Sequence, residues 1–577
     1  MTGSTGTIPR PEHPNPQFER PHWRNLNGKW DFELDLSASG FDREAWRTPH
    51  FNSTIIVPFC PESTLSGIGF TDFIAACWYH RTVEITADEL SGLVYLHFGA
   101  VDYEAHVYIN GAEVGLHKGG YASFRFEISK YLHEGANDIV VGVKDDVRSA
   151  AQPGGKQSDR HYSYDCMYTR TTGIWQTVWL EYVPQTHIDR VRYYPNIDET
   201  SVTIEAKVSG QGRLRAEVSF AGNVCGKAET SASNGLVMLT VPLAERHLWK
   251  PGEGNLYDVA LTFGEDTISS YFGLRELRID GYRFLINGES VFQRLVLDQG
   301  FYPDGIYTAP DEQALVRDIE LSLAAGFNGA RLHEKAFEPR FLYHCDRLGY
   351  IAWGEMANWG LDISDTANYA SFIPEWMELV ERDFNHPAIV GWCPFNETWD
   401  QNGRRQIDDI LRLTYNVTKA LDPTRPCIDT SGHYHVVTDI YDIHDYDQDP
   451  ESFRQKYAAF AEGKDTFTDV HAARQTYPGG IPFFISEYGG IKWIPPFLED
   501  IHSWGYGDAA TSEEEYIARY KALTDPLIDD PNMFGFCYTQ LYDVEQECNG
   551  VYAYDRRPKV SIEAIASINR RKAAIEQ

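Results

Sequence analysis

The feature that most constrains the fold is an alternation of short apolar runs with helical stretches over residues 277–577. The runs are VFQRLVLD, FNGARLHE, YIAWGEM, IVGWCPFNE, PCIDTSG, DIYDIHDY, PFFISEY and FGFCYTQLYD. Stretches with helical periodicity, such as DEQALVRDIELSLAAG and SFIPEWMELVERDFN, lie between them. Parallel strands need such crossover helices, so eight strands over about 300 residues predict a (β/α)8 TIM barrel.

The residues before the barrel have a different pattern. Residues 24–184 alternate apolar and polar positions and carry an Asn-Gly turn in INGAEVG, which predicts a jelly-roll-like β-sandwich. Residues 185–276 hold short alternating strands with no helical period, which predicts an immunoglobulin-like β-sandwich. Residues 1–23 are rich in proline and polar residues, and we expect a loose arm that lies over the surface.

Composition excludes several classes of partner. The net charge of −33 repels phosphate backbones and anionic lipid, so we expect neither a nucleic acid nor a membrane partner. No apolar run approaches the roughly 20 residues that span a bilayer. The first 23 residues lack the apolar core of a signal peptide, and the nine cysteines show no CxxC spacing. These features predict a cytoplasmic protein with reduced thiols.

Two apolar runs end on a glutamate. GWCPFNETW contains Glu397 after the fourth strand candidate, and IPFFISEYGG contains Glu487 in the seventh. The carboxyl ends of barrel strands form the active site, so strands distant in sequence converge on one mouth. Two carboxylates there can lie about 5 Å apart, the separation that retaining glycoside hydrolysis needs. We therefore expect the two side chains to meet.

The order of the three regions, with FNE followed later by SEYGG, resembles glycoside hydrolase family 2. The segments NLNGKWDF, VYINGAEVG, TTGIWQTVWLE, FNGARLHE and YTQLYDVEQECNGVYAYDRRPK are also similar to family segments. The resemblance implies that Glu397 is the general acid/base and Glu487 the nucleophile. It implies that Asn396 binds the 2-hydroxyl of the sugar, and that neither a metal nor an organic cofactor is required.

Further residues follow from their places at strand ends. Similarity to the family implies that Arg331 and His333 support the sugar subsite and the nucleophile, although a salt-bridge partner and a core histidine would look the same. His444 or Tyr446 would lie near the nucleophile. Other substrate-binding candidates are Asp298 and Glu355, which could equally cap the following helices, and more weakly Tyr488 and Gln540.

The segment GHYHVV could form part of a metal site, because His433 and His435 would point the same way on a strand. A transition-metal site needs a third ligand, and the sequence offers none, so we predict no metal. Two rival functions remain: a non-catalytic carbohydrate-binding protein, and a metal-dependent hydrolase built on the histidines.

The sequence constrains the identity of the sugar less than it constrains the type of reaction. We expect an exo-acting enzyme for terminal β-galactosides in an oligosaccharide or small glycoside. The stretch FQRLVLDQGFYPDGIYTAP departs from the family pattern, so α-L-arabinopyranoside, uronic acid, mannoside and furanoside stay as alternatives. The segment ECNGVYAY lacks the lysine of the β-glucuronidase motif, which disfavours a glucuronide, while Lys492 could supply a cation for another uronic acid. Family similarity also allows a homo-oligomer.

Overall fold

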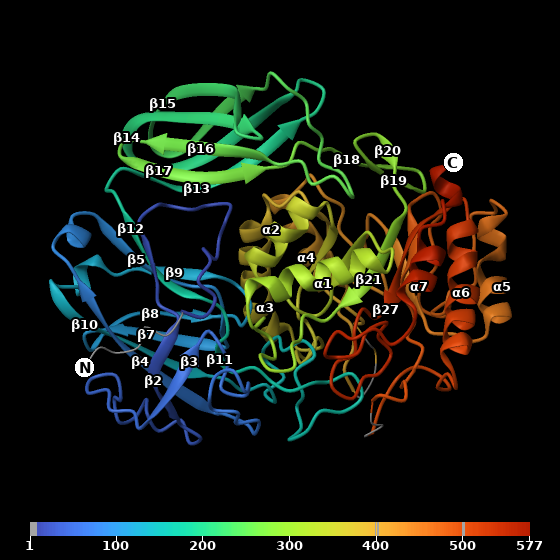
Figure 1. Ribbon diagram of the computed structural model, residues 1–577, viewed down its shortest axis with the longest axis horizontal. Helices are drawn as coiled ribbons and strands as arrows, with labels where there is room; N and C mark the ends of the chain where they lie inside the picture. The colour runs from blue at the N-terminus through green and yellow to red at the C-terminus, as the bar shows by residue number, and fades with distance from the viewer. Residues whose placement is uncertain (1–7, 399, 401–402, 499–501) are drawn as a thin grey trace.

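The carboxyl-terminal half forms a curled parallel sheet surrounded by helices, in a computed structural model that describes residues 8–398, 400, 403–498 and 502–577 (Figure 1). The strand order in the sheet is β24-β23-β22-β21-β27-β26-β25. The strands are β21 (Gln293–Asp298), β22 (Gly329–Leu332), β23 (Ile351–Glu355), β24 (Ile389–Cys393), β25 (Tyr441–Asp445), β26 (Phe483–Gly489) and β27 (Met533–Thr539). The prediction of a TIM barrel is confirmed.

The fifth strand candidate, PCIDTSG, is not a regular strand, although it occupies a strand position. Its backbone pairs with the edge of β24, where Trp392 N–H donates to the Pro426 carbonyl (3.0 Å) and Ile428 N–H to the Trp392 carbonyl (2.9 Å). On its other side the Ser431 hydroxyl donates to Asp442 in β25 (2.6 Å). Pro426 has no N–H to donate, and side-chain contacts replace part of a backbone ladder here.

Helices follow most of the strands, as a βα barrel requires. They are α1 (Glu312–Ala324), α2 (Pro339–Leu348), α3 (Tyr369–Asp383), α4 (Asp408–Leu421), α5 (Pro450–Ala461), α6 (Glu513–Asp529) and α7 (Ile562–Asn569). Asp311 caps α1 by accepting the Ala314 N–H (2.8 Å), and Ser512 caps α6 through the Glu515 N–H (3.2 Å). None of the helices in the described part of the chain is long and apolar enough to cross a membrane.

The first domain is the predicted β-sandwich. Its larger sheet has the order β3-β2-β4-β10-β7-β8, its smaller sheet is β1-β12-β5-β9, and β11 pairs with β6. The strands are β1 (Trp23–Asn25), β2 (Gly28–Leu34), β3 (Ser53–Val57), β4 (Ala76–Ile85), β5 (Leu93–Phe98), β6 (Val101–Asp102), β7 (Glu104–Ile109), β8 (Ala112–Lys118), β9 (Phe124–Glu127), β10 (Gly135–Lys144), β11 (Gly173–Ile174) and β12 (Val178–Val183).

The second domain, drawn in green at the top of Figure 1, is built on one long β-ribbon. β14 (Ser201–Phe220) pairs with β15 (Asn223–Pro242) along its length, with β13 (His187–Asn196) through its first half and with β16 (Tyr257–Phe263) through its second. β17 (Asp266–Phe272) pairs with β16. β18 (Leu277–Asp280), β19 (Arg283–Ile286) and β20 (Glu289–Ser290) form a small sheet before the barrel begins.

Residues 8–22 are tied to all three domains, which corrects the expectation of a loose arm for the part of it that the structure describes. Arg10 pairs with Glu338 beside the barrel helix α2 (2.7 Å). Arg20 pairs with Glu181 of the first domain (3.0 Å) and Asp266 of the second (2.8 Å). Residues 8–22 therefore form a connecting segment, because Arg10 and Arg20 form ion pairs with all three domains.

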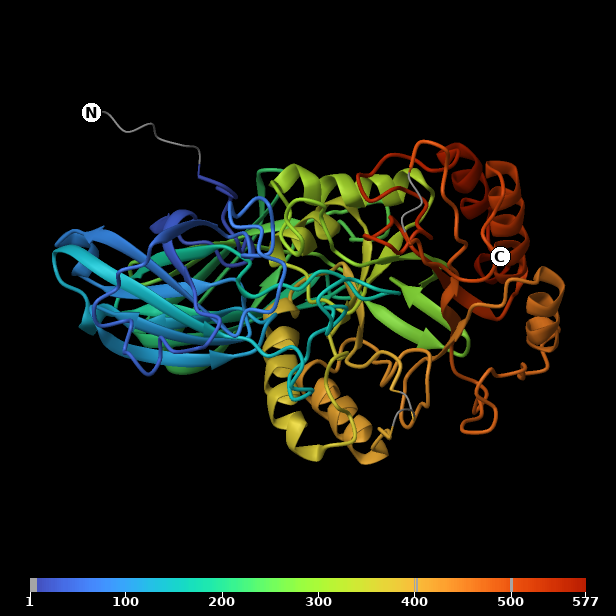
Figure 2. The ribbon, with the colours of Figure 1, turned by 90° about the horizontal axis from the view of Figure 1, so that it is seen from below.

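One connection of the first domain reaches the barrel mouth. We call residues 145–172, between β10 and β11, the sandwich loop; it runs from the sandwich to the barrel in Figure 2. Gly154 N–H donates to the Trp359 carbonyl (2.8 Å), and Thr169 N–H donates to Glu545 (3.1 Å). These contacts place side chains of the first domain beside the ends of the barrel strands.

Candidate functional site

Glu397 and Glu487 meet at the mouth of the barrel, as expected. Glu487 lies in β26 and Glu397 four residues beyond the end of β24. One carboxylate oxygen of Glu397 and one of Glu487 lie within 4.8 Å of each other. Glu487 is buried, whereas the side chain of Glu397 remains 11% exposed and borders a cavity. The two carboxylates thus share one space, and Glu397 is the one nearer to solvent.

Arg331 in β22 connects the residues of the site. Its Nη1 donates to Glu487 Oε1 (3.1 Å) and to the Ser486 carbonyl (2.8 Å), and its Nε donates to Glu355 Oε1 (2.5 Å). Glu355 also contacts His333 Nδ1 through its second oxygen (3.2 Å). Glu355 therefore orients Arg331 and His333, whereas the N-cap position of the following helix α3 is held by Asn368. Arg331 is both an ion-pair partner and a direct contact of the expected nucleophile.

Glu487 is held in its ionised form. Burial alone would raise its pKa, but electrostatic interactions with His444, His333, Arg331 and Lys156 outweigh burial and lower the pKa to about 2. The Tyr446 hydroxyl donates to Glu487 Oε2 (2.5 Å). Both carboxylate oxygens thus accept hydrogen bonds from groups that favour the anion, as a nucleophilic carboxylate requires.

His444, at the end of β25, lies between the two carboxylates. Its Nδ1 lies 2.7 Å from Glu397 Oε1 and its Nε2 lies 3.4 Å from Glu487 Oε1. Burial lowers its pKa, but Glu487 and Glu397 raise it further, so the net shift is upward. Of the described residues, these three form a group that could hold a metal ion. An imidazole that tends to carry a proton between two carboxylates is a poor metal ligand, because the ligand form is neutral.

Asn396 presents an unused donor to the site. Its Oδ1 accepts a hydrogen bond from Arg331 Nη2 (3.2 Å), and its backbone N–H donates to Asn358 Oδ1 (2.7 Å). Its Nδ2 is buried with no hydrogen-bond partner among the described residues. A buried donor without a partner costs free energy, so a group that binds here and accepts from it is favoured.

Lys156 is a charged residue of the site that the sequence did not reveal. It lies on the sandwich loop, is 6% exposed, and its Nζ lies 3.9 Å from the centroid of the Trp359 ring. Burial lowers its pKa, but Cys166, Glu547, Glu487 and Glu397 raise it, and the net shift is upward. Lys156 therefore stays a cation. No local signal in GGKQSDR indicates this contact, because it depends on the packing of one domain against another.

The remaining candidates form their hydrogen bonds with residues other than the two glutamates. Asp298 accepts hydrogen bonds from the Tyr542 hydroxyl (2.5 Å) and the Gly300 N–H (2.9 Å), so it orders the loop after β21. The Tyr488 hydroxyl contacts Thr524 of α6 (2.8 Å), on the helix side of β26. Gln540 donates to Asn549 (2.8 Å), and Lys492 donates to the Ser503 carbonyl (2.8 Å). Gln540 Oε1 is buried with no hydrogen-bond partner among the described residues, and a role of these side chains in sugar binding stays a prediction.

The GHYHVV segment has a structural explanation. His435 Nδ1 lies 2.7 Å from Asp429 Oδ1, and its Nε2 lies 2.8 Å from the Asp442 carbonyl. Burial lowers the pKa of His435, but the two aspartates raise it to about 10. Both ring nitrogens are thus engaged, and the histidine is a buried cation between two acids.

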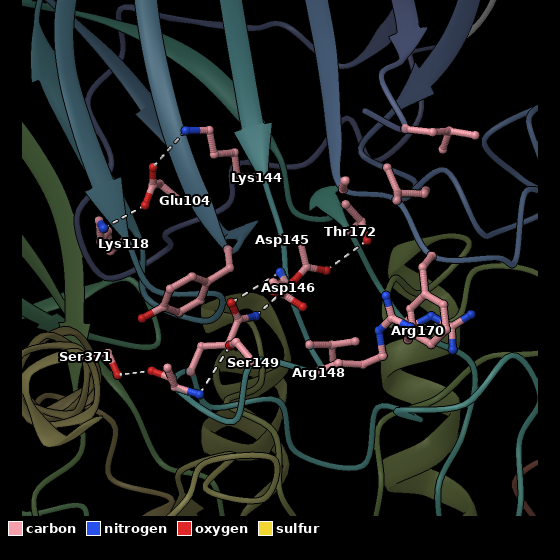
Figure 3. A pocket seen from close by; sticks show the side chains of 18 residues that line it. Glu104, Lys118, Lys144, Asp145, Asp146, Arg148, Ser149, Arg170, Thr172 and Ser371 are labelled. Atoms are coloured by element: carbon pink, nitrogen blue, oxygen red, sulfur yellow. Dashed lines mark hydrogen bonds and ion pairs between the residues drawn. The ribbon is translucent and has the colours of Figure 1, made fainter. Parts of the chain in front are cut away.

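A second cavity, of about 580 Å³, lies between the first domain and α3 (Figure 3). Lys118 and Lys144 lie on either side of Glu104 there, and Thr172 donates to Asp145 (2.9 Å). Its lining contains neither Glu397 nor Glu487. The barrel mouth is therefore the candidate active site.

Comparison with known proteins agrees with this arrangement. Residues 23–184 match the sugar binding domain of glycosyl hydrolases family 2, residues 186–275 match the domain named for the family itself, and residues 279–491 match its TIM barrel domain. The chain belongs to glycosyl hydrolase family 2. The family places a retaining glycosidase on this fold, and the paired carboxylates suit that reaction.

Family members of different specificity resemble the chain to a similar degree. A β-glucuronidase of Felis catus is 25% identical over 71% of this chain and 68% of its own length. A β-galactosidase of Thermoanaerobacter pseudethanolicus is 28% identical over 70% of this chain and 53% of its own length. The solved structure of a Lactobacillus rhamnosus β-glucuronidase superposes with a TM-score of 0.79, at 20% identity, over 96% of this chain and 98% of that one.

Proposed function

We propose that the protein is a retaining exo-β-glycosidase in which Glu487 is the nucleophile and Glu397 the general acid/base. The observation that carries the proposal is the pair of carboxylates within 4.8 Å of each other, of which Glu487 is held ionised with a pKa of about 2. A short separation leaves no room for water between sugar and nucleophile, which favours a covalent intermediate.

In the first step Glu487 attacks the anomeric carbon while the bond from that carbon to the glycosidic oxygen breaks. Glu397 gives its proton to the departing oxygen, and His444, its hydrogen-bond partner at 2.7 Å, can share that proton before the reaction. In the second step Glu397 takes a proton from water, the oxygen of that water bonds to the anomeric carbon, and Glu487 is released. The free Nδ2 of Asn396 donates to the sugar 2-hydroxyl in this scheme.

For the sugar we propose a terminal β-galactoside, with a β-uronide as the second candidate. Similarity to a β-galactosidase supports the first. Lys156 supports the second, because a buried ammonium beside the site could bind a carboxylate, and the similar β-glucuronidases point the same way. The missing lysine in ECNGVYAY therefore does not exclude a uronide, since the sandwich loop supplies a cation from another direction.

The test is chromophore release from aryl β-galactoside, β-glucoside, β-mannoside, β-glucuronide, β-galacturonide and both ring forms of α-L-arabinoside. Glu487→Ala should lower kcat by on the order of 10⁴-fold or more without unfolding the chain. Glu397→Ala should keep partial activity on substrates with activated leaving groups, which need little protonation, and azide should restore turnover. A Glu487→Ala variant as active as the unmodified protein would overturn the proposal.

Lys156→Met separates the two sugars. At pH 7, well above the Glu487 pKa of about 2, kcat/KM for a uronide substrate should fall about 10- to 100-fold, the value of a hydrogen bond to a charged group, while any β-galactoside activity changes little. An equal loss of kcat/KM for the uronide and the β-galactoside would show that Lys156 does not contact the sugar.

A further inference from the structure

A cavity of about 540 Å³ opens beside Glu397 where the first domain meets the barrel. One wall comes from the sandwich loop, with Tyr164 and Met167, and the other from the segment after β23, with Trp359, Leu361 and Ile363. Its lining includes Glu397 but not Glu487. A volume of this size accommodates a ligand of several rings.

The position of the cavity identifies what would fill it, on the basis of the proposed function. The general acid protonates the glycosidic oxygen, so the leaving group must lie on the side of Glu397. Glu487 attacks from the opposite side of the anomeric carbon, where the leaving group cannot lie. A space that borders Glu397 alone is therefore on the leaving-group side of the substrate.

The chemistry of the walls identifies the kind of leaving group. Five lining side chains are apolar or aromatic. The polar groups between them already form hydrogen bonds within the protein. Asn358 exchanges hydrogen bonds with the backbone of Asn396 (2.7 and 3.1 Å), and Trp359 Nε1 donates to the Asn396 carbonyl (3.2 Å). Apart from Glu397, the charged members of the lining are Asp159 and Arg404, which are exposed. A second sugar would find few partners for its hydroxyls, whereas a planar apolar group needs none.

We propose that this cavity is a subsite for an aromatic aglycone of more than one ring, with the sandwich loop as its outer wall. Tyr164 is half-buried and its hydroxyl donates to Asp159 (2.8 Å), which fixes the position of its ring. Met167 is also half-buried and offers a deformable apolar contact to a ring. The first domain thus selects the leaving group while the barrel binds the sugar.

The test compares glycosides of one sugar that differ in the leaving group: methyl, phenyl and 2-naphthyl. The double variant Tyr164→Ala/Met167→Ala should lower kcat/KM for the 2-naphthyl glycoside about tenfold and change that for the methyl glycoside less than twofold. Hydrolysis of the 2-deoxy-2-fluoroglycosyl enzyme, from which the aglycone has departed, should be unchanged. Arg148→Ala in the second cavity (Figure 3) is the matched control and should behave as the unmodified protein.

A second measurement does not depend on catalysis. Isothermal titration with 2-naphthol should detect binding to the unmodified protein and to Arg148→Ala, and about tenfold weaker binding to the double variant. Binding of naphthol without hydrolysis of any glycoside would refute the proposed function and leave the cavity as a site for aromatic ligands. Equal losses on all three glycosides, or naphthol affinity that the double variant leaves unchanged, would overturn the inference.

Discussion

At the scale of single residues, the charge on Glu487 depends on cations from two domains. His444 and Arg331 belong to the barrel, while Lys156 belongs to the sandwich loop. Together they outweigh the burial of the carboxylate, which would otherwise favour its neutral form. The reactivity of the barrel carboxylate is therefore partly set by the first domain.

Lys156→Met should raise the pKa of Glu487. Removal of a positive charge makes the ionised form less favourable, so the pKa moves up from about 2 and the acid limb of the reaction moves to higher pH. The measurement is the pH dependence of inactivation by a 2-deoxy-2-fluoroglycosyl fluoride, which needs the ionised nucleophile but little acid assistance. Lys144→Met, which lines the second cavity, is the control, and an unchanged limb in Lys156→Met would refute this role.

The protein should need no metal ion. His444 has a raised pKa and lies against both carboxylates, so the group of Glu397, His444 and Glu487 is explained by hydrogen bonds. Prolonged dialysis against EDTA should leave kcat/KM unchanged, and elemental analysis of the active protein should find no stoichiometric metal. Loss of activity on dialysis that zinc restores would favour the rival metal-dependent hydrolase instead.

Residue-level prediction from sequence succeeded where a strand end carried the information. Glu397, Glu487, Arg331 and His444 were expected at barrel strand ends, and the structure brings them together. Lys156 was not expected, because only the docking of two domains places it there. The same reasoning misplaced Tyr488, since adjacent residues of a strand point to opposite faces and Glu487 takes the inner one.

At the scale of elements, the sandwich loop depends on a glycine where it enters the barrel. Gly155 has a φ of +56° and donates to the Trp359 carbonyl (3.0 Å), and a Cβ built on it would lie 2.3 Å from the Glu334 carbonyl oxygen. Neither the backbone conformation nor the space admits a side chain. The segment PCIDTSG also depends on its neighbours: its apolar pattern predicts a strand, but its hydrogen bonds go to β24 on one side and to a side chain of β25 on the other.

Gly155→Ala should displace the sandwich loop and lower kcat/KM by on the order of 10-fold or more, because small displacements of positioning groups are costly to catalysis. Lys156, the next residue, would move with it. Gly135→Ala is the control: its φ is +98° and no atom lies within 4 Å of an added Cβ, so it should lose stability by about 1 kcal/mol and keep its activity. The checks are steady-state kinetics and the Tm of both variants, and equal activities would show that the loop tolerates the change.

At the scale of the whole molecule, the connecting segment of residues 8–22 links the domains through buried charges. Arg20 is 2% exposed and contacts Glu181 in β12 and Asp266 in β17. Burial raises the pKa of Glu181, but His97, Arg20 and Arg125 lower it further, so it stays ionised. The order of the domains is predictable from the strand and helix patterns. The connection through residues 8–22 is not, because a polar, proline-rich segment has the same sequence pattern whether or not its charged residues form ion pairs.

Arg20→Ala should destabilise the protein by about 3–5 kcal/mol, because it leaves two buried carboxylates without their shared cation. Arg47→Ala, which removes an exposed pair with Glu44, should cost less than about 1 kcal/mol. Differential scanning calorimetry would separate the transitions of the domains, and the transitions of the two sandwiches should fall most in Arg20→Ala. A lower transition temperature for the barrel alone, or the same transition temperatures in both variants, would show that the connecting segment does not hold the two sandwiches together.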